Sequence, residues 1–114
     1  MIAVIFEVRP LPEQRQRYLD LAAALAAHLR EIDGFVSVER FQSLGEPDKL
    51  LSLSFWRDEQ AVMRWRSTEE HRRAQTLGRD EVFRGYRLRV ASVLRDYSLD
   101  ERDQAPADSR GFHG

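Results

Sequence analysis

Hydrophobic residues in this chain recur with two different periods, and the order of those periods constrains the fold. A period of two residues is typical of a strand, and a period near 3.6 residues is typical of a helix. Strand periods occur in residues 2–8, 35–44, 50–56 and 86–97, and helical periods occur in residues 13–32 and 58–83. This order is the split βαβ pattern. We therefore expect an α+β, ferredoxin-like fold with two helices on one face of a four-stranded antiparallel sheet.

The second face of the expected sheet is too apolar to lie in water. Helices on one face would leave Ala3, Ile5, Ala91 and Val93 exposed on the other. Exposed apolar surface of this kind is usually covered by a partner. We therefore expect a homodimer that forms through the sheet face about a twofold axis.

Proline and glycine residues predict where the first helix and the hairpin begin and end. Pro12 suits the first turn of a helix, and Gly34 suits a left-handed cap after residue 32. The turn signals in residues 45–48 separate two strand patterns, which we expect to pair as a hairpin.

The second helix is expected in two pieces. Asp58 can cap a short piece that carries Trp65. Ser67-Thr68-Glu69-Glu70 matches a capping box, in which Ser67 is the N-cap and Glu70 reaches back to it. The second piece would then run to about Phe83 and end at Gly85.

Length and charge limit the class of protein. The 114 residues suffice for one domain, which we place at residues 1–97, followed by a polar tail at 98–114. Such a tail is expected to be mobile on its own. The 19 acidic and 18 basic residues nearly balance, and the arginines interleave with acids rather than form a basic stripe. We therefore expect no binding to nucleic acid.

The chain has no cysteine, which excludes disulfides, thiolate nucleophiles and cysteine-ligated metals. The opening apolar run is too short for a signal peptide and lacks a basic leader. No later run has the length of a membrane span. We therefore expect a cytoplasmic protein that makes no contact with a membrane.

His71 is the candidate for acid–base chemistry, because it is the histidine in the stretch that also holds both tryptophans. Imidazole titrates near neutral pH, and the start of a helix favours its neutral form, which suits a general base. The alternative is a structural histidine at a helix start. His28, His71 and His113 have no ligand spacing, so no metal site is expected.

Three segments carry a resemblance to a known family: the strand-end FW followed by RDEQA, then RWRSTEEHRRAQ, then GYRLRVASVLRDY. They resemble the antibiotic biosynthesis monooxygenase family of dimeric α+β barrels, over roughly residues 1–97. That family includes cofactor-independent oxygenases of aromatic compounds, quinol oxygenases and heme-degrading enzymes.

The resemblance implies a ligand pocket between the sheet and the broken helix. The residues expected to bind a substrate there are Trp56, Trp65, Gln75, Phe83 and Tyr86. The alternative is that these aromatic side chains are simply core, since each can bury a large area. Arg87 and Arg89 are candidates for binding an anionic substrate at the barrel rim, or for salt bridges.

Heme chemistry is the second interpretation. The heme-degrading relatives that the chain resembles have a tryptophan, an iron-ligating histidine ten residues later, and an asparagine on the first strand. Trp65 matches the tryptophan, but Gln75 stands at the histidine position and the chain has no asparagine. His71 lies one turn earlier.

We therefore predict a cofactor-independent monooxygenase that acts on a small aromatic or quinol compound. His71 would be the base, and Trp65 and Tyr86 would position the ring. The alternatives are a heme-binding or heme-degrading monooxygenase and a non-catalytic ligand-binding dimer of the same fold.

Overall fold

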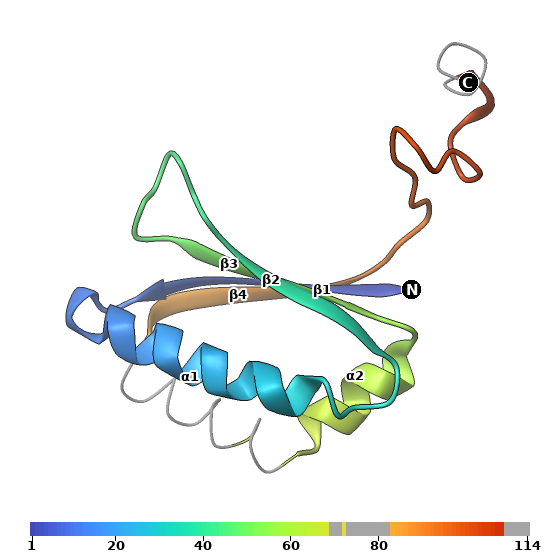
Figure 1. Ribbon diagram of the computed structural model, residues 1–114. Helices are drawn as coiled ribbons and strands as arrows, with labels where there is room; N and C mark the ends of the chain where they lie inside the picture. Colours follow the sequence, from blue (N-terminus) through green and yellow to red (C-terminus); the bar gives the residue numbers. More distant parts are fainter. Residues whose placement is uncertain (69–71, 73–82, 109–114) are drawn as a thin grey trace.

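The chain folds as an α+β, ferredoxin-like domain, which confirms the fold expected from the periodicity (Figure 1). The computed structural model describes residues 1–68, 72 and 83–108. Its elements, in chain order, are β1 (Ile2–Pro10), a short 3-10 helix η1 (Pro12–Gln14), α1 (Arg15–Leu29), β2 (Phe35–Gln42), β3 (Leu50–Trp56), α2 (Glu59–Arg66) and β4 (Phe83–Ser92).

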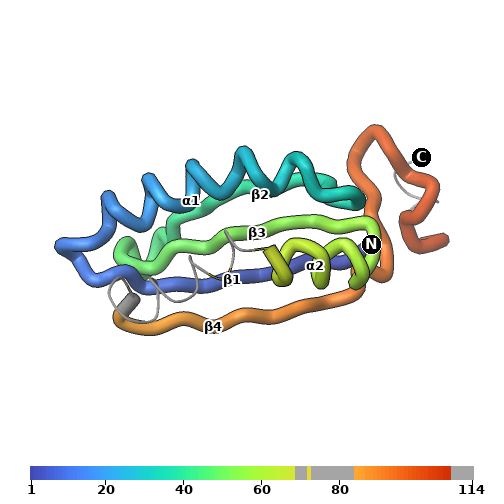
Figure 2. Tube along the Cα trace, turned by 90° about the horizontal axis from the view of Figure 1, so that it is seen from below, coloured from blue at the N-terminus to red at the C-terminus, as the bar shows by residue number. Residues whose placement is uncertain are grey.

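The four strands form one antiparallel sheet in the order β2-β3-β1-β4 (Figure 2). Strand β1 lies between β3 and β4, so Val4 is opposite Ser54 on one side and opposite Val90 on the other. Strands β2 and β3 form the predicted hairpin. Helices α1 and α2 both lie against one face of the sheet (Figure 1).

Two clusters of buried residues connect the helices to the sheet. The first contains Val4, Leu29, Trp56, Ala61 and Val62, and the second contains Val8, Tyr18, Ala22 and Leu50. Trp56 and Val8 are the largest side chains that are fully buried. Helix α1 therefore contributes to both clusters, whereas α2 contributes to the first alone.

Helix α2 begins at the predicted N-cap. The Asp58 Oδ1 atom accepts a hydrogen bond from the Ala61 N–H group at 2.9 Å. Asp58 has extended backbone angles, as an N-cap residue normally does. The cap orients the first turn so that Ala61 is fully buried against the sheet.

The predicted role of Ser67 as an N-cap is wrong. Ser67 has helical backbone angles and is the C-cap of α2, and its hydroxyl donates to the Met63 carbonyl at 2.9 Å. Helical hydrogen bonding resumes one residue later, because the Arg72 N–H group donates to the Thr68 carbonyl at 3.2 Å.

Gly34 has the left-handed conformation that was predicted, with φ of 93°. A Cβ atom at this position would lie 2.6 Å from the Ala61 Cβ atom. The Gly34 carbonyl also accepts a hydrogen bond from the Arg57 N–H group at 2.7 Å. Glycine is therefore required here both by the backbone angle and by the close approach of α2.

Several predicted boundaries differ from the structure. Strand β1 ends at Pro10 rather than at residue 8, β2 ends at Gln42 rather than at residue 44, and α1 begins at Arg15 rather than at residue 13. The first helix ends at Leu29 rather than at residue 32. Beyond Leu29 the backbone hydrogen bonds span three residues instead of four, as in the bond from the Ile32 N–H group to the Leu29 carbonyl. The last strand begins at Phe83 and ends at Ser92, instead of spanning residues 86–97. Its partner β1 starts at Ile2, so the residues after Val93 have no strand to pair with.

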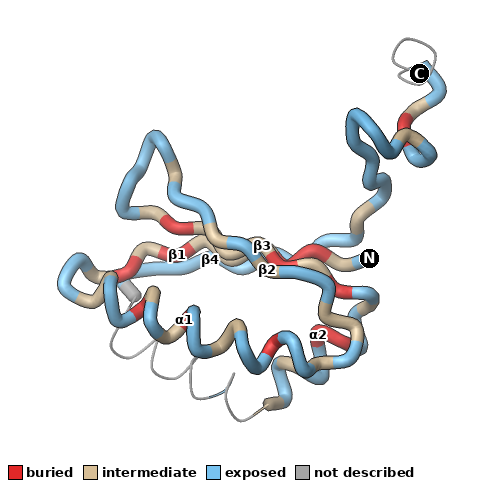
Figure 3. The backbone as a smooth tube through the Cα atoms, in the orientation of Figure 1, coloured by how far each residue is buried: buried red, intermediate tan, exposed pale blue. Residues whose placement is uncertain are grey.

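Residues 93–108 extend away from the domain toward the side of the sheet that the helices leave uncovered (Figure 1). Within this segment, the Asp96 N–H group donates to the Gln104 side chain at 2.7 Å, and the Arg102 guanidinium lies 5.2 Å from the centre of the Tyr97 ring. Most of the segment is exposed, and so is most of β4 (Figure 3).

Candidate functional site

A cavity of about 160 Å³ lies between the sheet and helix α1. All four strands and both α-helices contribute to its lining, which is formed by Val4, Phe6, Tyr18, Ala22, Leu25, Leu29, Val38, Arg40, Ser52, Ser54, Trp65, Tyr86 and Leu88. Cavities of about 150 Å³ lined by apolar side chains accommodate a single benzene ring. The size and the lining therefore suit one small ring.

Trp65 forms the wall of the cavity next to α2. Its ring stacks on that of Trp56, with the centroids 5.4 Å apart and the planes inclined by 23°. Trp56 itself is fully buried, and its Nε1–H group donates to the Ser54 hydroxyl at 2.9 Å. Trp56 is thus a core residue that supports Trp65 from behind, and it does not line the cavity.

Tyr86 lines the cavity from strand β4. Its ring centre lies 5.8 Å from that of Phe6 on the neighbouring strand. Tyr86 and Leu88 are each about half exposed, at 55% and 48%. Two of the residues predicted to bind a substrate, Trp65 and Tyr86, therefore lie on the same cavity.

The other predicted site residues are not placed on the cavity. His71 and Gln75 lie outside the described residues, and so does the Phe83 side chain. The backbone of Phe83 begins β4, where it is opposite Pro10.

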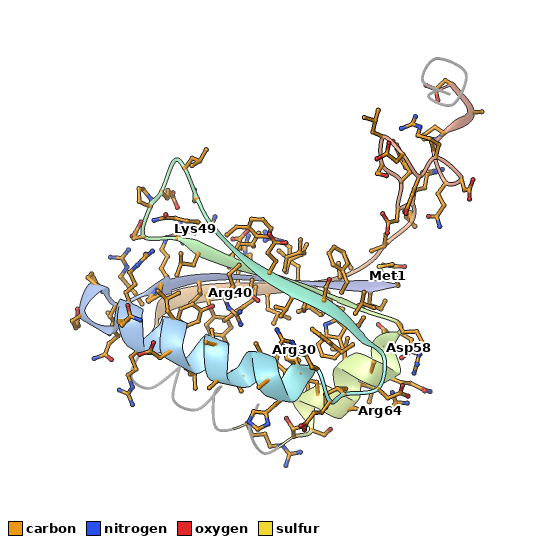
Figure 4. All side chains as sticks on the ribbon, viewed as in Figure 1. Met1, Arg30, Arg40, Lys49, Asp58 and Arg64 are labelled. Atoms are coloured by element: carbon orange, nitrogen blue, oxygen red, sulfur yellow. The ribbon has the colours of Figure 1, made fainter. Side chains whose placement is uncertain are left out.

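Arg40 brings a positive charge to the otherwise mostly apolar cavity. It is on β2 opposite Ser52, and it lies between the sheet and α1 (Figure 4). Its Nη2 atom donates to the Ala22 carbonyl at 3.2 Å. Its Nε atom is buried and has no hydrogen-bond partner among the described residues.

Tyr18 of α1 lies beside Arg40. Only 6% of Tyr18 is exposed, and this burial raises the pKa of its phenol, while a hydrogen bond and the positive charge from Arg40 act in the opposite direction. A hydroxyl and a guanidinium therefore meet at one end of a cavity whose other walls are largely aromatic and aliphatic.

Arg87 and Arg89, which were candidates for binding an anion, lie on the opposite face of the sheet from the cavity. They alternate along β4 with Tyr86 and Leu88. The Arg89 Nη1 atom donates to Glu7 at 3.1 Å, and the Lys49 Nζ atom lies 3.3 Å from Glu7. The hydrogen bond from Lys49 is the main reason that the pKa of Glu7 is lowered, and Arg89 adds to the effect.

Sequence reasoning missed Arg40 and Tyr18 as neighbours in the cavity. The one available signal was that Arg40 shares a strand face with Val38, an apolar residue. An arginine at an inward position of a half-apolar strand indicates a partly buried charge, and Arg40 is half-buried. In the part of the chain that is described, no group of three or more His, Asp or Glu side chains could hold a metal ion. None of the described helices is long and apolar enough to cross a membrane.

The sequence profile of the family described as antibiotic biosynthesis monooxygenase matches residues 1–77. A jasmonate monooxygenase of Pyricularia oryzae is 52% identical over 101 residues, which are 89% of this chain and 47% of that protein. The chain thus spans about half the length of this curated relative.

Solved structures show the same fold. The structure of Rv0793 from Mycobacterium tuberculosis matches with a TM-score of 0.77 and 22% identity, over 85% of this chain and 98% of that one. A crystal structure of an antibiotic biosynthesis monooxygenase matches with a TM-score of 0.72 and 19% identity, over 82% of this chain and 99% of that one. The match to residues 1–77 and the 52% identity to a curated relative lead to one conclusion: the chain belongs to the antibiotic biosynthesis monooxygenase family.

Proposed function

We propose that this protein is a monooxygenase that oxidises a small aromatic or quinol compound inside the cavity, without a cofactor. Membership of the family supports monooxygenase chemistry. The observation that carries the substrate class is a ring-sized cavity of about 160 Å³ with an indole wall, Trp65, held in place by a second indole. Flat aromatic ligands pack well against such a wall.

The chemistry needs no external reductant if the substrate supplies all the electrons. Hydroquinone and dioxygen, for example, give hydroxybenzoquinone and water. A base first removes a phenol proton, and the electron-rich phenolate transfers electron density to dioxygen. A ring carbon then bonds to one oxygen atom. Loss of the ring hydrogen and cleavage of the O–O bond leave a carbonyl on the ring and release the other oxygen atom as water.

His71 remains our candidate for the base. A general base with a pKa near neutrality is the group this proton transfer requires. The relative from Pyricularia oryzae is named as a jasmonate monooxygenase, which supports oxidation of a small organic molecule.

Oxygen uptake with a panel of hydroquinones tests the function. We expect uptake above the spontaneous rate, persistence of that uptake in a chelator, and one ¹⁸O atom in the quinone product when ¹⁸O₂ is supplied. His71→Ala should abolish turnover, while His28→Ala, on the exposed side of α1, should not change it. Uptake no faster than the spontaneous rate with every compound would contradict the proposal.

We also propose that the protein is a homodimer that forms through the uncovered sheet face. This outer face, opposite the helices, carries Ile5 of β1 and Leu51, Leu53 and Phe55 of β3. The extended segment 93–108 leaves the domain on this side and exposes Leu94 and Leu99 at 85% and 81%. A second copy related by a twofold axis would cover both the apolar face and these leucines.

A further inference from the structure

Arg40 is a charged side chain in a place where the described part of the chain provides no opposite charge. It lies in the lining of an apolar cavity, and no described carboxylate forms an ion pair with it. Among the described residues, it forms hydrogen bonds with the Ala22 carbonyl and Tyr18, both neutral. The buried Nε–H group has no acceptor among the described residues.

Other arginines in the described part of the chain are paired with carboxylates, so the position of Arg40 is unusual. Arg57 forms two hydrogen bonds of 3.2 Å to the carboxylate of Asp33, and Arg89 is paired with Glu7. Arg9 is paired with Glu46. Each of those pairs is on the surface, where pairing matters least, because water already solvates the charges.

Burial without a partner is costly. A buried donor without an acceptor loses its hydrogen bond to water and gains nothing in return. A buried charge costs more still unless a counter-charge or several hydrogen bonds compensate it. A residue that keeps such an arrangement is expected to recover the cost when a ligand binds, because an anionic oxygen supplies both the acceptor and the counter-charge.

We propose that Arg40, together with the Tyr18 hydroxyl, binds an anionic oxygen of a ring-sized apolar ligand. The proposal rests on the proposed function, since it takes the cavity to be the substrate site. The anionic oxygen is either the phenolate oxygen of the reacting ring or a carboxylate attached to it. Both are recognised by the same fork of N–H groups.

The two sources have different consequences for the reaction. Binding of the phenolate oxygen stabilises the ionised substrate, which is the form that reacts with dioxygen, so Arg40 would act in catalysis. Binding of a carboxylate instead fixes the orientation of the ring against Trp65, and Arg40 would then determine substrate specificity.

Binding measurements with matched pairs of ring compounds test the proposal without any need for turnover. The phenolate arm compares 4-nitrophenol with 4-nitroanisole, and the carboxylate arm compares benzoate with methyl benzoate, by calorimetry. The ionisation of 4-nitrophenol is also followed by its visible absorption. We expect at least one anion to bind about tenfold more tightly than its neutral partner. A preference for 4-nitrophenolate assigns the phenolate, and a preference for benzoate assigns the carboxylate.

Variants identify the residue responsible. Arg40→Met should remove the preference for the anion, and Arg40→Lys should keep part of it, because the charge remains while the fork is lost. Arg30→Met removes an exposed arginine just beyond the end of α1 and should leave the preference unchanged. Circular dichroism verifies folding. If Arg40→Met does not fold, Tyr18→Phe is used in its place. This variant should weaken binding of the anion without weakening binding of its neutral partner.

Two outcomes would overturn the inference in distinguishable ways. If anionic and neutral partners bind equally, or if Arg40→Met retains the preference, the cavity takes rings but Arg40 does not bind the oxygen. In that case the proposed function stands. If none of the four compounds binds the wild-type protein, the cavity is not a site for single-ring ligands, and the proposed function fails together with the inference.

Discussion

The indole rings of Trp56 and Trp65 are stacked with their centroids 5.4 Å apart, although one belongs to strand β3 and the other to helix α2. Trp56 is fixed by its hydrogen bond to Ser54 and by a T-shaped contact with the Phe35 ring, whose centre lies 5.2 Å away. The stack therefore ties α2 to the sheet and holds the Trp65 face of the cavity in position.

Replacing Trp65 should affect both stability and binding. Trp65→Ala removes the stack and the cavity wall, so we expect a loss of about 2 kcal/mol in the free energy of unfolding and weaker binding of ring compounds. Trp65→Phe retains an aromatic face, so it should lose less stability and less affinity for ring compounds than Trp65→Ala. Urea unfolding and calorimetry measure the two effects. Equal stability of the alanine and phenylalanine variants would show that the stack contributes little.

Gly34→Ala should destabilise the fold. The substitution forces a residue with a side chain into φ of 93° and places a Cβ atom 2.6 Å from that of the buried Ala61. We expect a loss of about 2 kcal/mol in the free energy of unfolding. Gly45→Ala is the matched control, because nothing lies within 4 Å of the added Cβ atom, and its effect should stay within about 0.5 kcal/mol. A tolerated Gly34→Ala would mean that α2 moves away from the turn.

Stability should fall in acid, partly because of Asp58. The hydrogen bond from Ala61 and then the contact with Arg57 lower the pKa of Asp58 below 3.8, and Arg57 likewise lowers the pKa of Asp33. As the pH falls, these two carboxylates therefore become protonated in the unfolded chain at a higher pH than in the folded protein. The stability that these carboxylates contribute is present above about pH 5 and is lost progressively below it.

Two variants of Asp58 separate its charge from its cap. Asp58→Asn keeps an oxygen acceptor for Ala61 but cannot titrate, so its difference from the wild type in melting temperature should shrink between pH 7 and pH 3. Asp58→Ala loses the cap as well and should melt below Asp58→Asn at both pH values. If the wild type and Asp58→Asn respond to acid identically, Asp58 makes no contribution to the acid sensitivity.

A charge on the outer sheet face should dissociate the proposed dimer. Leu53→Glu or Phe55→Glu would place a carboxylate in the centre of the apolar face, and we expect the mass from light scattering to halve. Leu44→Glu, in the hairpin where Leu44 is 99% exposed, should leave the mass unchanged. A wild-type mass equal to that of one chain would contradict the dimer directly.

Local sequence determined the elements and two of their boundaries. Periodicity predicts the order of strands and helices, Asp58 predicts the start of α2, and Gly34 predicts a left-handed turn. These features depend on backbone angles and on bonds between residues a few positions apart, so a short stretch of sequence contains the information. The end of β4 was not predictable in this way, because a strand ends where its neighbour ends.

For β3, the tertiary structure alone decided which strand face meets the helices. Alternation on β3 separates Leu51, Leu53 and Phe55 from Ser52, Ser54 and Trp56, but it does not say which set faces inward. The face that carries the serines and Trp56 points inward: Trp56 packs against the helices and Ser54 lines the cavity, while the leucines form the outer face.

The cavity shows the same division. The family resemblance implied that Trp56, Trp65 and Tyr86 line a pocket; Trp65 and Tyr86 line the cavity, whereas Trp56 belongs to the core. Arg40 and Tyr18 were not foreseen as partners. They lie 22 positions apart on a strand and a helix, and their meeting depends on how α1 crosses the sheet. Periodicity describes each segment separately, and only packing between segments determines which side chains meet at the cavity.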